Sequence, residues 1–351
     1  MSRLILVGHL LCISGICAAQ ENSLTGEWLL WIETAWGWEP FEGNVGPIPD
    51  NPVYATLVFE ETQGGLSVFV NGGPVNLLEL DGRGISFDID WTDLNDQVHV
   101  SVLRGVLEND VIRGSATDDG ANLGAWRATP ILKRDTSTPA ADPVDLVGIW
   151  GVAPMLMKYS YDLTEAGQTT DDAYDPTIDD SALRCVSDGL IRMSLGPFKI
   201  EVLEREGRII VLHEDMHEVR RIYTDGRSFP EGIENANLSM GYSVGHCEAG
   251  TLVVETRGLK KVMWDAAGMP ISSSAVVRER WYLDETGQLH IEYSVSDPAY
   301  YNHPILMHQV RPKAPDDAQM FEYSCDPHAF YRSLQLEGRL EEYWGRSGNR
   351  L

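Results

Sequence analysis

Beyond residue 19, the sequence lacks any run of about 18 consecutive apolar residues, the length that a membrane-spanning helix needs. It also lacks a Gly-x-Ser-x-Gly elbow, a phosphate-binding glycine loop and a dinucleotide fingerprint, which excludes the enzyme classes built on them. Basic residues are few, since 27 lysines and arginines face 53 acidic residues and the net charge is −26. Because such a surface repels phosphates and anionic lipid, we expect no nucleic acid partner. Since no long apolar run is present, we expect no membrane insertion. We expect no cofactor.

Cysteine is also scarce, with five residues in 351, two of them near the N-terminus. Residues 1–19 combine a basic start, a short apolar run and a small-residue exit, which predicts a secretory signal peptide cleaved after Ala19. We therefore expect a periplasmic or secreted protein. In an oxidising compartment the three remaining cysteines predict one disulfide. Cys185 and Cys325 lie near the two ends of the second half and are the pair we favour, although sequence alone leaves the connectivity open.

A repeated β pattern dominates the rest of the chain. About 330 mature residues suggest two units, and a stretch rich in Pro, Thr, Ala and Asp over residues 134–145 is typical of a linker. Residues 24–28 and 146–150 share the pattern L-x-G-x-W, which indicates two copies of a related architecture. We predict a small β-barrel-like domain over residues 20–133 and a larger β domain with a C-terminal helix over residues 146–351.

The two units differ in their content. Short strands at about ten-residue spacing, with Gly and Asn turns between them, make the first unit resemble a lipocalin-like barrel in architecture. The second unit has a polar helical excursion at 158–173 and a helix at 326–343 that begins at Asp326-Pro327. Its expected strands are 199–203, 208–213, 219–223, 251–256, 275–283, 289–296 and 305–311. The fold class predicted is mostly β, with two antiparallel β-barrel or sandwich units.

One block of the second unit carries a family resemblance. Residues 214–227 read EDMHEVRRIYTDGR, and further matching residues stand at 184–192 and 241–256. The blocks resemble an uncharacterised family of exported bacterial proteins with the pattern E-x-x-H-x-x-R-x-I-Y-x-D-G-R. The resemblance covers residues 146–326 and departs at residues 246–247, where that family has a basic residue followed by tryptophan. It implies export and a fold, and it implies no reaction.

Residues 213–217 read HEDMH, a literal H-E-x-x-H. On a helix, His213 and His217 would share a face and bind zinc, with Glu214 polarising a water molecule. Strand-like β-branched residues flank the motif on both sides, and no metzincin-type continuation follows. We therefore expect a β-hairpin here and keep His213 and His217 only as a remote metal pair.

If the motif is a strand, residues two apart share a face, so His213 and His217 would continue to Arg221 and Tyr223. Ionisable groups inside a barrel need partners. Arg221 would find one in Asp225 or Glu279.

This arrangement leaves two interpretations. One is a polar pocket floor on which Glu214, His217 and Arg221 are catalytic groups, and the other is a salt-bridge network that only fixes the hairpin. The side chains expected to line a ligand pocket are Tyr223, Asp225, Arg227, His246, Glu279, Tyr300 and His303.

The sequence thus predicts an exported soluble β-barrel protein that binds a small apolar or aromatic molecule. The alternative is a metal-independent lyase, hydratase or isomerase on the same scaffold, and an H-E-x-x-H zinc hydrolase is the third hypothesis. The expected partner is a small-molecule ligand, and the oligomeric state stays open.

Overall fold

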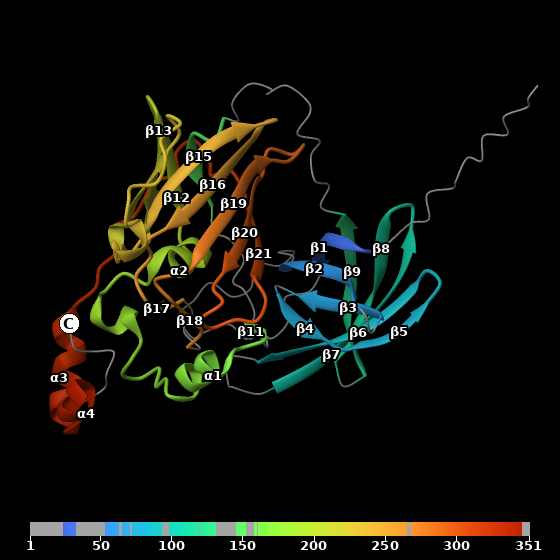
Figure 1. Cartoon of the computed structure of the whole chain (residues 1–351), viewed down its shortest axis with the longest axis horizontal. Coiled ribbons are helices and arrows are strands. Elements are labelled where there is room, and N and C mark those ends of the chain that lie inside the picture. The colour runs from blue at the N-terminus through green and yellow to red at the C-terminus, as the bar shows by residue number, and fades with distance from the viewer. Residues whose placement is uncertain are drawn as a thin grey trace, which may run out of the picture.

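The computed structural model describes residues 24–32, 53–62, 65–70, 72–92, 98–118, 120–130, 145–151, 158–159, 161–264 and 268–345. The expected signal peptide and nearly all of the expected linker lie outside these residues. Two sheets each curl into a nearly closed barrel, and helices occur in the second half and at the C-terminal end (Figure 1). The predicted mostly β fold class with two barrel units is confirmed.

The first sheet is an antiparallel meander. Its strands are β1 (Gly26–Ile32), β2 (Val53–Thr62), β3 (Gly65–Val70), β4 (Gly73–Val75), β5 (Leu77–Asp81), β6 (Gly84–Thr92), β7 (Val98–Glu108), β8 (Val111–Asp118) and β9 (Ala121–Pro130). Strand β9 pairs back onto β1, while β4 pairs with β3 and β5 pairs with β6. Between β4 and β5, the Asn76 carbonyl accepts a hydrogen bond from the Asp88 N–H at 3.1 Å. The short pair β4 and β5 therefore completes the circuit.

Alternation of apolar residues builds the core of this barrel. Leu30, Leu57 and Phe87 are fully buried on successive inner faces, and each such side chain contributes about 1.5–3 kcal/mol of burial free energy. Trp126 fills the space beside Gly105, where a Cβ atom would lie 2.6 Å from the indole ring. Glycine at residue 105 is thus required for the tryptophan to reach the core.

The second sheet has nine strands, in the order β10-β12-β13-β14-β15-β16-β19-β20-β21. Their bounds are β10 (Gly148–Trp150), β12 (Ile200–Arg205), β13 (Arg208–His213), β14 (Val219–Tyr223), β15 (Tyr242–Glu248), β16 (Thr251–Arg257), β19 (Val276–Leu283), β20 (Leu289–Ser296) and β21 (Ile305–Arg311). All neighbours are antiparallel except β14 and β15. Hydrogen bonds from the Gly151 N–H to the Pro312 carbonyl (2.7 Å) and from the Ala314 N–H to the Ile149 carbonyl (2.9 Å) close the ring. We call this junction the seam.

The shared L-x-G-x-W opening has the same local structure in both sheets. Trp28 and Trp150 each donate their indole N–H to the carbonyl four residues earlier, at 2.8 Å in both cases. A glycine lies two residues before each tryptophan. Its φ is 134° at Gly26 and 129° at Gly148, a backbone conformation that residues with a side chain rarely adopt. The repeated pattern therefore encodes a repeated turn that places a buried tryptophan at the start of each barrel.

Helices and short strands surround the second sheet. They are β11 (Lys158–Tyr159), α1 (Glu165–Asp172), α2 (Gly189–Leu195), α3 (Pro327–Glu337), α4 (Leu340–Gly345), β17 (Val262–Met263), β18 (Pro270–Ile271) and the 3₁₀ turns η1 (Ser181–Arg184), η2 (Asp215–His217) and η3 (Ile233–Asn235). The Asp326 carboxylate caps α3 by accepting from the His328 N–H at 3.0 Å, as its sequence indicated. Gly338, with φ of 73°, ends α3 and divides the expected single helix in two. No helix in the described ranges is long and apolar enough to cross a membrane.

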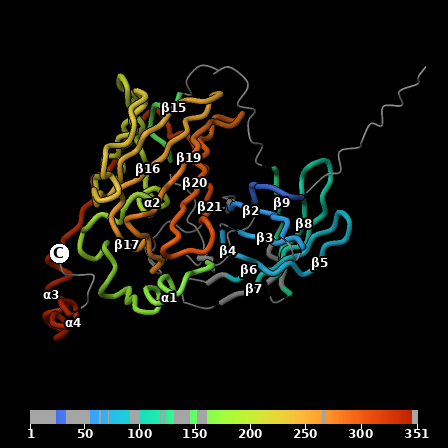
Figure 2. The backbone as a smooth tube through the Cα atoms, viewed as in Figure 1, coloured from blue at the N-terminus to red at the C-terminus, as the bar shows by residue number. Residues whose placement is uncertain are grey.

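The two barrels are in contact. Strand β11 follows β10 in sequence but pairs with β6 of the first sheet, and Tyr161 just after it packs against both cores. Strand β21 lies beside β2 (Figure 2). At the same contact the rings of Phe69 and His303 are 5.1 Å apart. Buried residues of β2 that point away from their own core, Thr56 and Val58, are covered in this way.

Candidate functional site

The H-E-x-x-H segment is a strand end followed by a 3₁₀ turn. His213 ends β13 and is buried, whereas His217 is exposed. Met216 and His217 both have positive φ, 49° and 53°, so the two histidines share no helix face. Among the described residues, no group of three or more His, Cys, Asp or Glu side chains is placed to hold a metal ion. The expected hairpin is present, and the zinc hydrolase hypothesis loses the helix on which it depends.

The inner face of β14 is carried by Arg220, so our assignment of Arg221 to that face was wrong. The left-handed turn at residues 216–217 interrupts the strand alternation and shifts the inner positions by one residue. Arg220 is 1% exposed and its Nη1 donates to the Glu279 carboxylate at 2.9 Å, while Arg221 is exposed. Glu279 is therefore inside the barrel, paired with a different arginine from the one expected.

Four further polar contacts complete the Arg220 environment. Its guanidinium donates to the Ser243 hydroxyl at 3.1 Å and to the Thr256 hydroxyl at 2.9 Å. The Trp281 indole N–H donates to Glu279 at 3.2 Å, and Arg220 makes a second, short contact with the same carboxylate. Burying such a pair is costly, and it is tolerated only when hydrogen bonds satisfy the remaining donors and acceptors, as they do here.

A second buried arginine lies on β21. Arg311 is 0% exposed, and its guanidinium donates to the carbonyls of Gly151 (2.8 Å), Phe198 (2.9 Å) and Ser194 (2.6 Å). Burial lowers the pKa of Arg311 to about 10. Ser194 belongs to the last turn of α2, where a cation is favoured by the helix dipole. Arg311 thus fixes α2 and the seam to the end of the barrel.

Two side chains of β21 keep unpartnered polar atoms on the barrel interior, namely Nε2 of Gln309 and Nε of Arg311. His213 is also buried, and the Met193 backbone is its hydrogen-bond partner. Burial lowers the pKa of His213 to about 3, and Arg220 and Arg311 act in the same direction while the Met193 carbonyl opposes them. The barrel interior therefore contains a neutral imidazole close to two guanidinium groups.

Glu214 and His217, the expected catalytic pair, hold the C-terminal segment. Glu214 accepts from the Phe321 N–H at 2.7 Å and pairs with Lys199 at 2.9 Å. The imidazole Nε2 of His217 accepts from the Tyr323 N–H at 2.9 Å. Burial raises the pKa of Glu214, but the hydrogen bonds from Lys199 and Phe321 outweigh it and keep that pKa below its usual value. In this arrangement both side chains act as anchors for residues 321–323.

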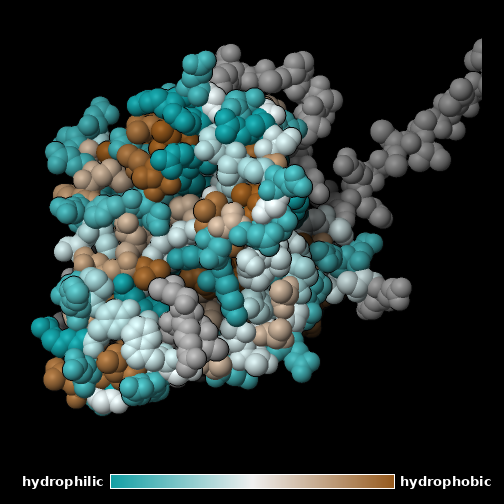
Figure 3. All heavy atoms as spheres, turned by 60° about the vertical axis from the view of Figure 1, so that its left-hand side comes forward, coloured by the Kyte–Doolittle hydropathy of each residue, from teal (hydrophilic) through white to brown (hydrophobic). Residues whose placement is uncertain are grey.

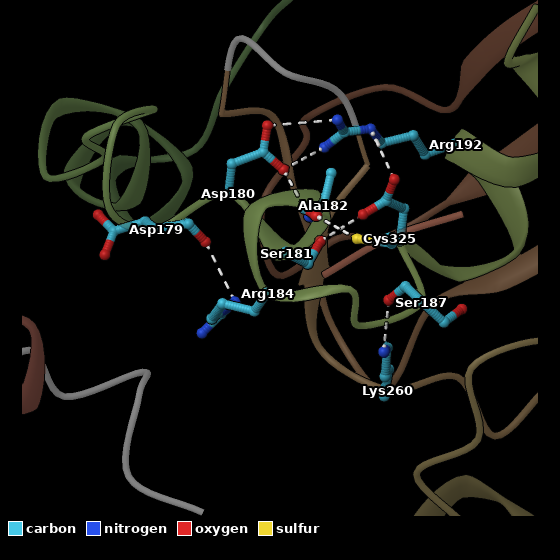
Figure 4. A network of polar contacts seen from close by, with 10 residues as sticks. Asp179, Asp180, Ser181, Ala182, Arg184, Ser187, Arg192, Lys260 and Cys325 are labelled. Atoms are coloured by element: carbon cyan, nitrogen blue, oxygen red, sulfur yellow. Dashed lines mark hydrogen bonds and ion pairs between the residues drawn. The ribbon is translucent and has the colours of Figure 1, made fainter. Parts of the chain in front are cut away.

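The first residue of this turn, Asp215, lies near a second buried carboxylate, that of Asp188. Burial raises the pKa of Asp215 to about 6, and the nearby Asp188 carboxylate adds to the shift while Arg192 opposes it. Arg192 bridges Asp188 (3.1 Å) and Asp180 (2.8 Å), and Figure 4 shows it beside Asp180. The Ser181 hydroxyl donates to Asp188 at 2.6 Å. The pKa of Asp188 is likewise raised, chiefly by burial.

The predicted disulfide Cys185–Cys325 is present, with Cα atoms 5.8 Å apart. It joins the residue after η1 to Cys325, which lies two residues before α3, and Figure 4 shows Cys325 beside Ser181 and Ala182 in the same cluster. The third cysteine of the described chain, Cys247, is exposed on β15. Of the family-like blocks, parts of residues 184–192 and 214–217 thus meet around one end of the second barrel.

The remaining predicted ligand residues do not converge with this end. Tyr223 and Arg227 stack on the outer face, with the guanidinium carbon 3.9 Å from the ring centroid, and Asp225 pairs with Arg227 at 2.5 Å. His246 is exposed beside Glu248. Tyr300 is buried below Lys261, and His303 lies at the contact between the barrels. These residues do not surround one common pocket in the described structure, and their role in ligand binding stays a prediction.

A buried histidine chain, which our sequence reasoning missed, lies on the outer face of β20 and β21. Nδ1 of His290 and Nε2 of His308 are 2.9 Å apart, and Nε2 of His290 is 3.2 Å from Asp284. The ring of Tyr282 stacks on His290 at 5.1 Å. If His290 donates to Asp284, His308 must donate to His290, which leaves a bare lone pair on Nδ1 of His308. Burial lowers the pKa of His308 to about 3.

A groove of about 460 Å³ follows the seam. Its walls include Gly151, Lys199, Pro312, Lys313, Pro315 and Phe321. Phe321 is 67% exposed, and the Lys199 ammonium is 4.2 Å from its ring centroid. Elsewhere the face shown in Figure 3 is mainly hydrophilic, with small separate hydrophobic areas. The groove therefore offers an apolar floor with two lysine side chains at its edge.

No family model matches the chain, and no curated protein matches its sequence. Two solved structures show partial similarity. One is a protein of unknown function from the DUF3598 family of Nostoc punctiforme PCC 73102, with 10% identity over 84% of this chain and 98% of that chain and a TM-score of 0.24. The other is the Aeromonas veronii immune modulator A, with 8% identity over 83% of this chain and 94% of that chain and a TM-score of 0.24. Similarity at this level carries no argument about activity.

Proposed function

We propose that the protein is exported and binds a small apolar or aromatic molecule in the seam groove of the second barrel. The observation that carries the proposal is the groove itself. Its volume of about 460 Å³ lies within the range of about 300–1,000 Å³ found for small-molecule sites. Its lining combines two prolines and an exposed phenylalanine with four polar or charged side chains, Lys199, Lys313, Asp317 and Gln319. Small-molecule sites likewise combine an apolar surface with a small number of placed polar groups.

The groove has a stable frame. Glu214 holds the backbone at Phe321 on one side, and the seam hydrogen bond from Gly151 to Pro312 fixes the other. Because both walls are tied to the barrel, the phenyl ring of Phe321 is presented to solvent at little conformational cost. A preformed apolar surface of this kind favours binding.

Catalysis by the expected groups receives less support. His217 and Arg221 are exposed, and the imidazole Nε2 of His217 is occupied by the Tyr323 N–H. A general base must lie within hydrogen-bonding distance of the proton that it removes, in a site that positions the substrate. We therefore favour binding over a lyase, hydratase or isomerase activity.

The test uses the neutral aromatic probe N-phenyl-1-naphthylamine, whose fluorescence rises in apolar surroundings. The wild-type protein is expected to bind it saturably, and Phe321→Ala is expected to raise the Kd about three- to tenfold because an aromatic contact is lost. Phe321→Ala leaves the backbone hydrogen bond to Glu214 intact. The matched control is Leu336→Ala, which removes an apolar side chain that is 82% exposed on α3. Equal Kd values for all three proteins, or no saturable binding, would refute the groove as the site.

A further inference from the structure

The seam groove reverses the charge balance of the chain. Acidic residues outnumber basic ones by 53 to 27 over the whole sequence, but the charged residues that line the groove are two lysines, Lys199 and Lys313, and one aspartate, Asp317. The protein as a whole therefore repels anions, while the groove offers them a cationic edge beside an apolar floor. The charge of the ligand can be inferred from these side chains.

Lys199 belongs to the aromatic part of the groove and is already neutralised. Its ammonium pairs with the Glu214 carboxylate at 2.9 Å and lies 4.2 Å from the centroid of the Phe321 ring. The same carboxylate accepts hydrogen bonds from the backbone N–H groups of Lys199 at 3.1 Å and of Phe321 at 2.7 Å. Because Glu214 balances its charge, Lys199 positions the phenyl ring and adds little net charge for a ligand.

Lys313 is held in place by the turn that opens the second barrel. Its Nζ donates to the Val147 carbonyl at 2.6 Å and lies 4.6 Å from the centroid of the Trp150 ring. A Cβ atom at Gly148 would lie 2.7 Å from this Nζ, so the ammonium occupies space that the glycine leaves open. At Gly26, the equivalent glycine of the first barrel, no atom of the described chain lies within 4 Å of that position. The repeated turn thus seats a cation in the second barrel and not in the described part of the first.

The charge of Lys313 is available to a ligand. No carboxylate within the described ranges forms an ion pair with this lysine, and the acceptor of its hydrogen bond is a neutral carbonyl. An ammonium group has three N–H donors, so two remain for a ligand. Because the Val147 carbonyl and the Trp150 ring already fix the side chain, binding costs less side-chain entropy than it does at an ordinary surface lysine.

We propose that the seam groove binds an aromatic molecule with a single anionic group, whose rings pack on Phe321 and the neighbouring prolines and whose anionic group pairs with Lys313. The inference rests on the proposed function and names the class of its ligand. Asp317 and the net charge of −26 oppose a ligand with several negative charges, which restricts the class to monoanions. Rings suit this floor, because an exposed phenyl side chain packs well against another aromatic ring.

The experiment compares two fluorescent probes that share one ring system. N-phenyl-1-naphthylamine is neutral, and 8-anilino-1-naphthalenesulfonate is the same molecule with one sulfonate group added. The measured quantity is the Kd of the sulfonate divided by the Kd of the neutral probe, for the full chain at low and constant ionic strength, because salt screens an exposed ion pair. Lys313→Met keeps the apolar stem and is expected to raise this ratio about two- to fivefold. Asp317→Asn is expected to lower the ratio, because it removes the carboxylate that opposes the anion.

The matched control is Lys261→Met. Lys261 is exposed, lies 5.5 Å from the centroid of the Tyr300 ring and does not line the groove. Its loss changes the net charge of the protein equally and should leave the ratio unchanged. Lys313→Arg keeps the positive charge and should keep the ratio close to that of the wild type. If Lys313→Met does not fold, Asp317→Asn, at an exposed residue, still decides the outcome.

The outcomes separate this proposal from the proposed function. A ratio that is the same in the wild type, Lys313→Met and Asp317→Asn would overturn the anionic class, while a raised Kd of the neutral probe in Phe321→Ala would still support the groove. An equal rise of the ratio in Lys261→Met would also overturn the anionic class, since the effect would then follow net charge alone. No saturable binding of either probe would disprove the proposed function, and the anionic class with it.

Discussion

Asp215 is the residue whose surroundings most oppose its charge. Its carboxyl is buried next to Asp188, and Arg192 and the Met216 N–H compensate only in part. Its pKa rises from 3.8 to about 6, so the folded state binds a proton more tightly than the unfolded state between these values. The stability contributed by this group is complete below about pH 3.8 and is lost as the pH rises through 6. At neutral pH, the charged carboxylate therefore destabilises the fold.

The first prediction concerns Asp215→Asn. At pH 7.5 the substitution should raise the free energy of unfolding by about 1–2 kcal/mol, after allowance for solvent screening, because it removes an unfavourable buried charge. Near pH 4 most of the gain should disappear, since the carboxyl is then protonated in the folded state and close to half protonated in the unfolded state. Urea unfolding at the two pH values measures the difference. Asp225→Asn, at an exposed site, is the control and should show no comparable gain; a gain for Asp215→Asn that is independent of pH would contradict the account.

Single-residue assignments from the sequence succeeded where one simple rule applied. Cys185 and Cys325 were paired because the other cysteines were unsuitable or central in the unit, and Glu279 was expected inside the barrel. Arg221 failed because strict alternation was carried through a turn that contains Met216 and His217 in left-handed conformation. Methionine does not favour that conformation, and histidine adopts it only more often than most other residues do, so the local signal for the shift is weak. Successive residues of a strand point to opposite faces, so one of the two adjacent arginines faces inward. This was the only feature of the sequence that pointed to Arg220.

At the scale of elements, the C-terminal segment is held at three points. Glu214 binds its backbone at Phe321, His217 binds it at Tyr323, and the disulfide retains it at Cys325. The first two contacts are hydrogen bonds accepted by side chains of η2 and its N-cap residue, and the third is covalent. The turn therefore determines how tightly the groove wall is fixed, while the disulfide determines whether the tail stays attached.

Glu214→Ala should loosen this segment without releasing it. Loss of the carboxylate removes two backbone hydrogen bonds and the Lys199 ion pair, so limited proteolysis between residues 318 and 324 should accelerate about tenfold. The cleaved C-terminal fragment should remain bound through Cys185–Cys325 and separate only after reduction. Comparing reducing and non-reducing gels measures both effects. Unchanged cleavage rates in Glu214→Ala would show that the turn does not hold the segment.

Element boundaries were largely readable from the sequence. The expected strands at residues 208–213, 219–223 and 305–311 coincide with β13, β14 and β21, because β-branched residues and glycine turns define them clearly. The parallel pairing of β14 with β15 was not predicted, since pairing across an 18-residue connection leaves no local pattern. Strand β11 was missed for a similar reason: it is two residues long and exists through pairing with β6.

At the scale of the whole molecule, the contact between the barrels buries titratable groups. His308 lies on the face of β21, the strand that packs beside β2, and His290 lies next to it on β20, with Asp284, Glu292 and Arg280 on neighbouring strands or turns. Glu27 of β1 acts on Glu292 across the contact. Because β2 and β21 pack together, a charge that forms on His308 has no water to solvate it.

Acidification should therefore destabilise the molecule. The pKa of His308 is lowered from 6.5 to about 3, so below pH 6.5 the unfolded state binds more protons than the folded state. Stability is complete above pH 6.5 and falls by about 2 kcal/mol for this group by pH 5. His213 adds a loss of the same sign, and Asp215 partly offsets both. Urea unfolding of His308→Gln between pH 7 and 5 should show a smaller loss than wild type; an identical loss would show that His308 titrates normally in the fold.

The central claim is that the second barrel is a binding protein for a small molecule. Native mass spectrometry of the protein, recovered gently from its own source, tests this claim most directly. The account predicts a species heavier than the bare chain by the mass of a small organic molecule, reduced in abundance in Phe321→Ala and retained in Leu336→Ala. A bare-chain mass for the wild-type protein, together with no saturable binding of N-phenyl-1-naphthylamine, would contradict it.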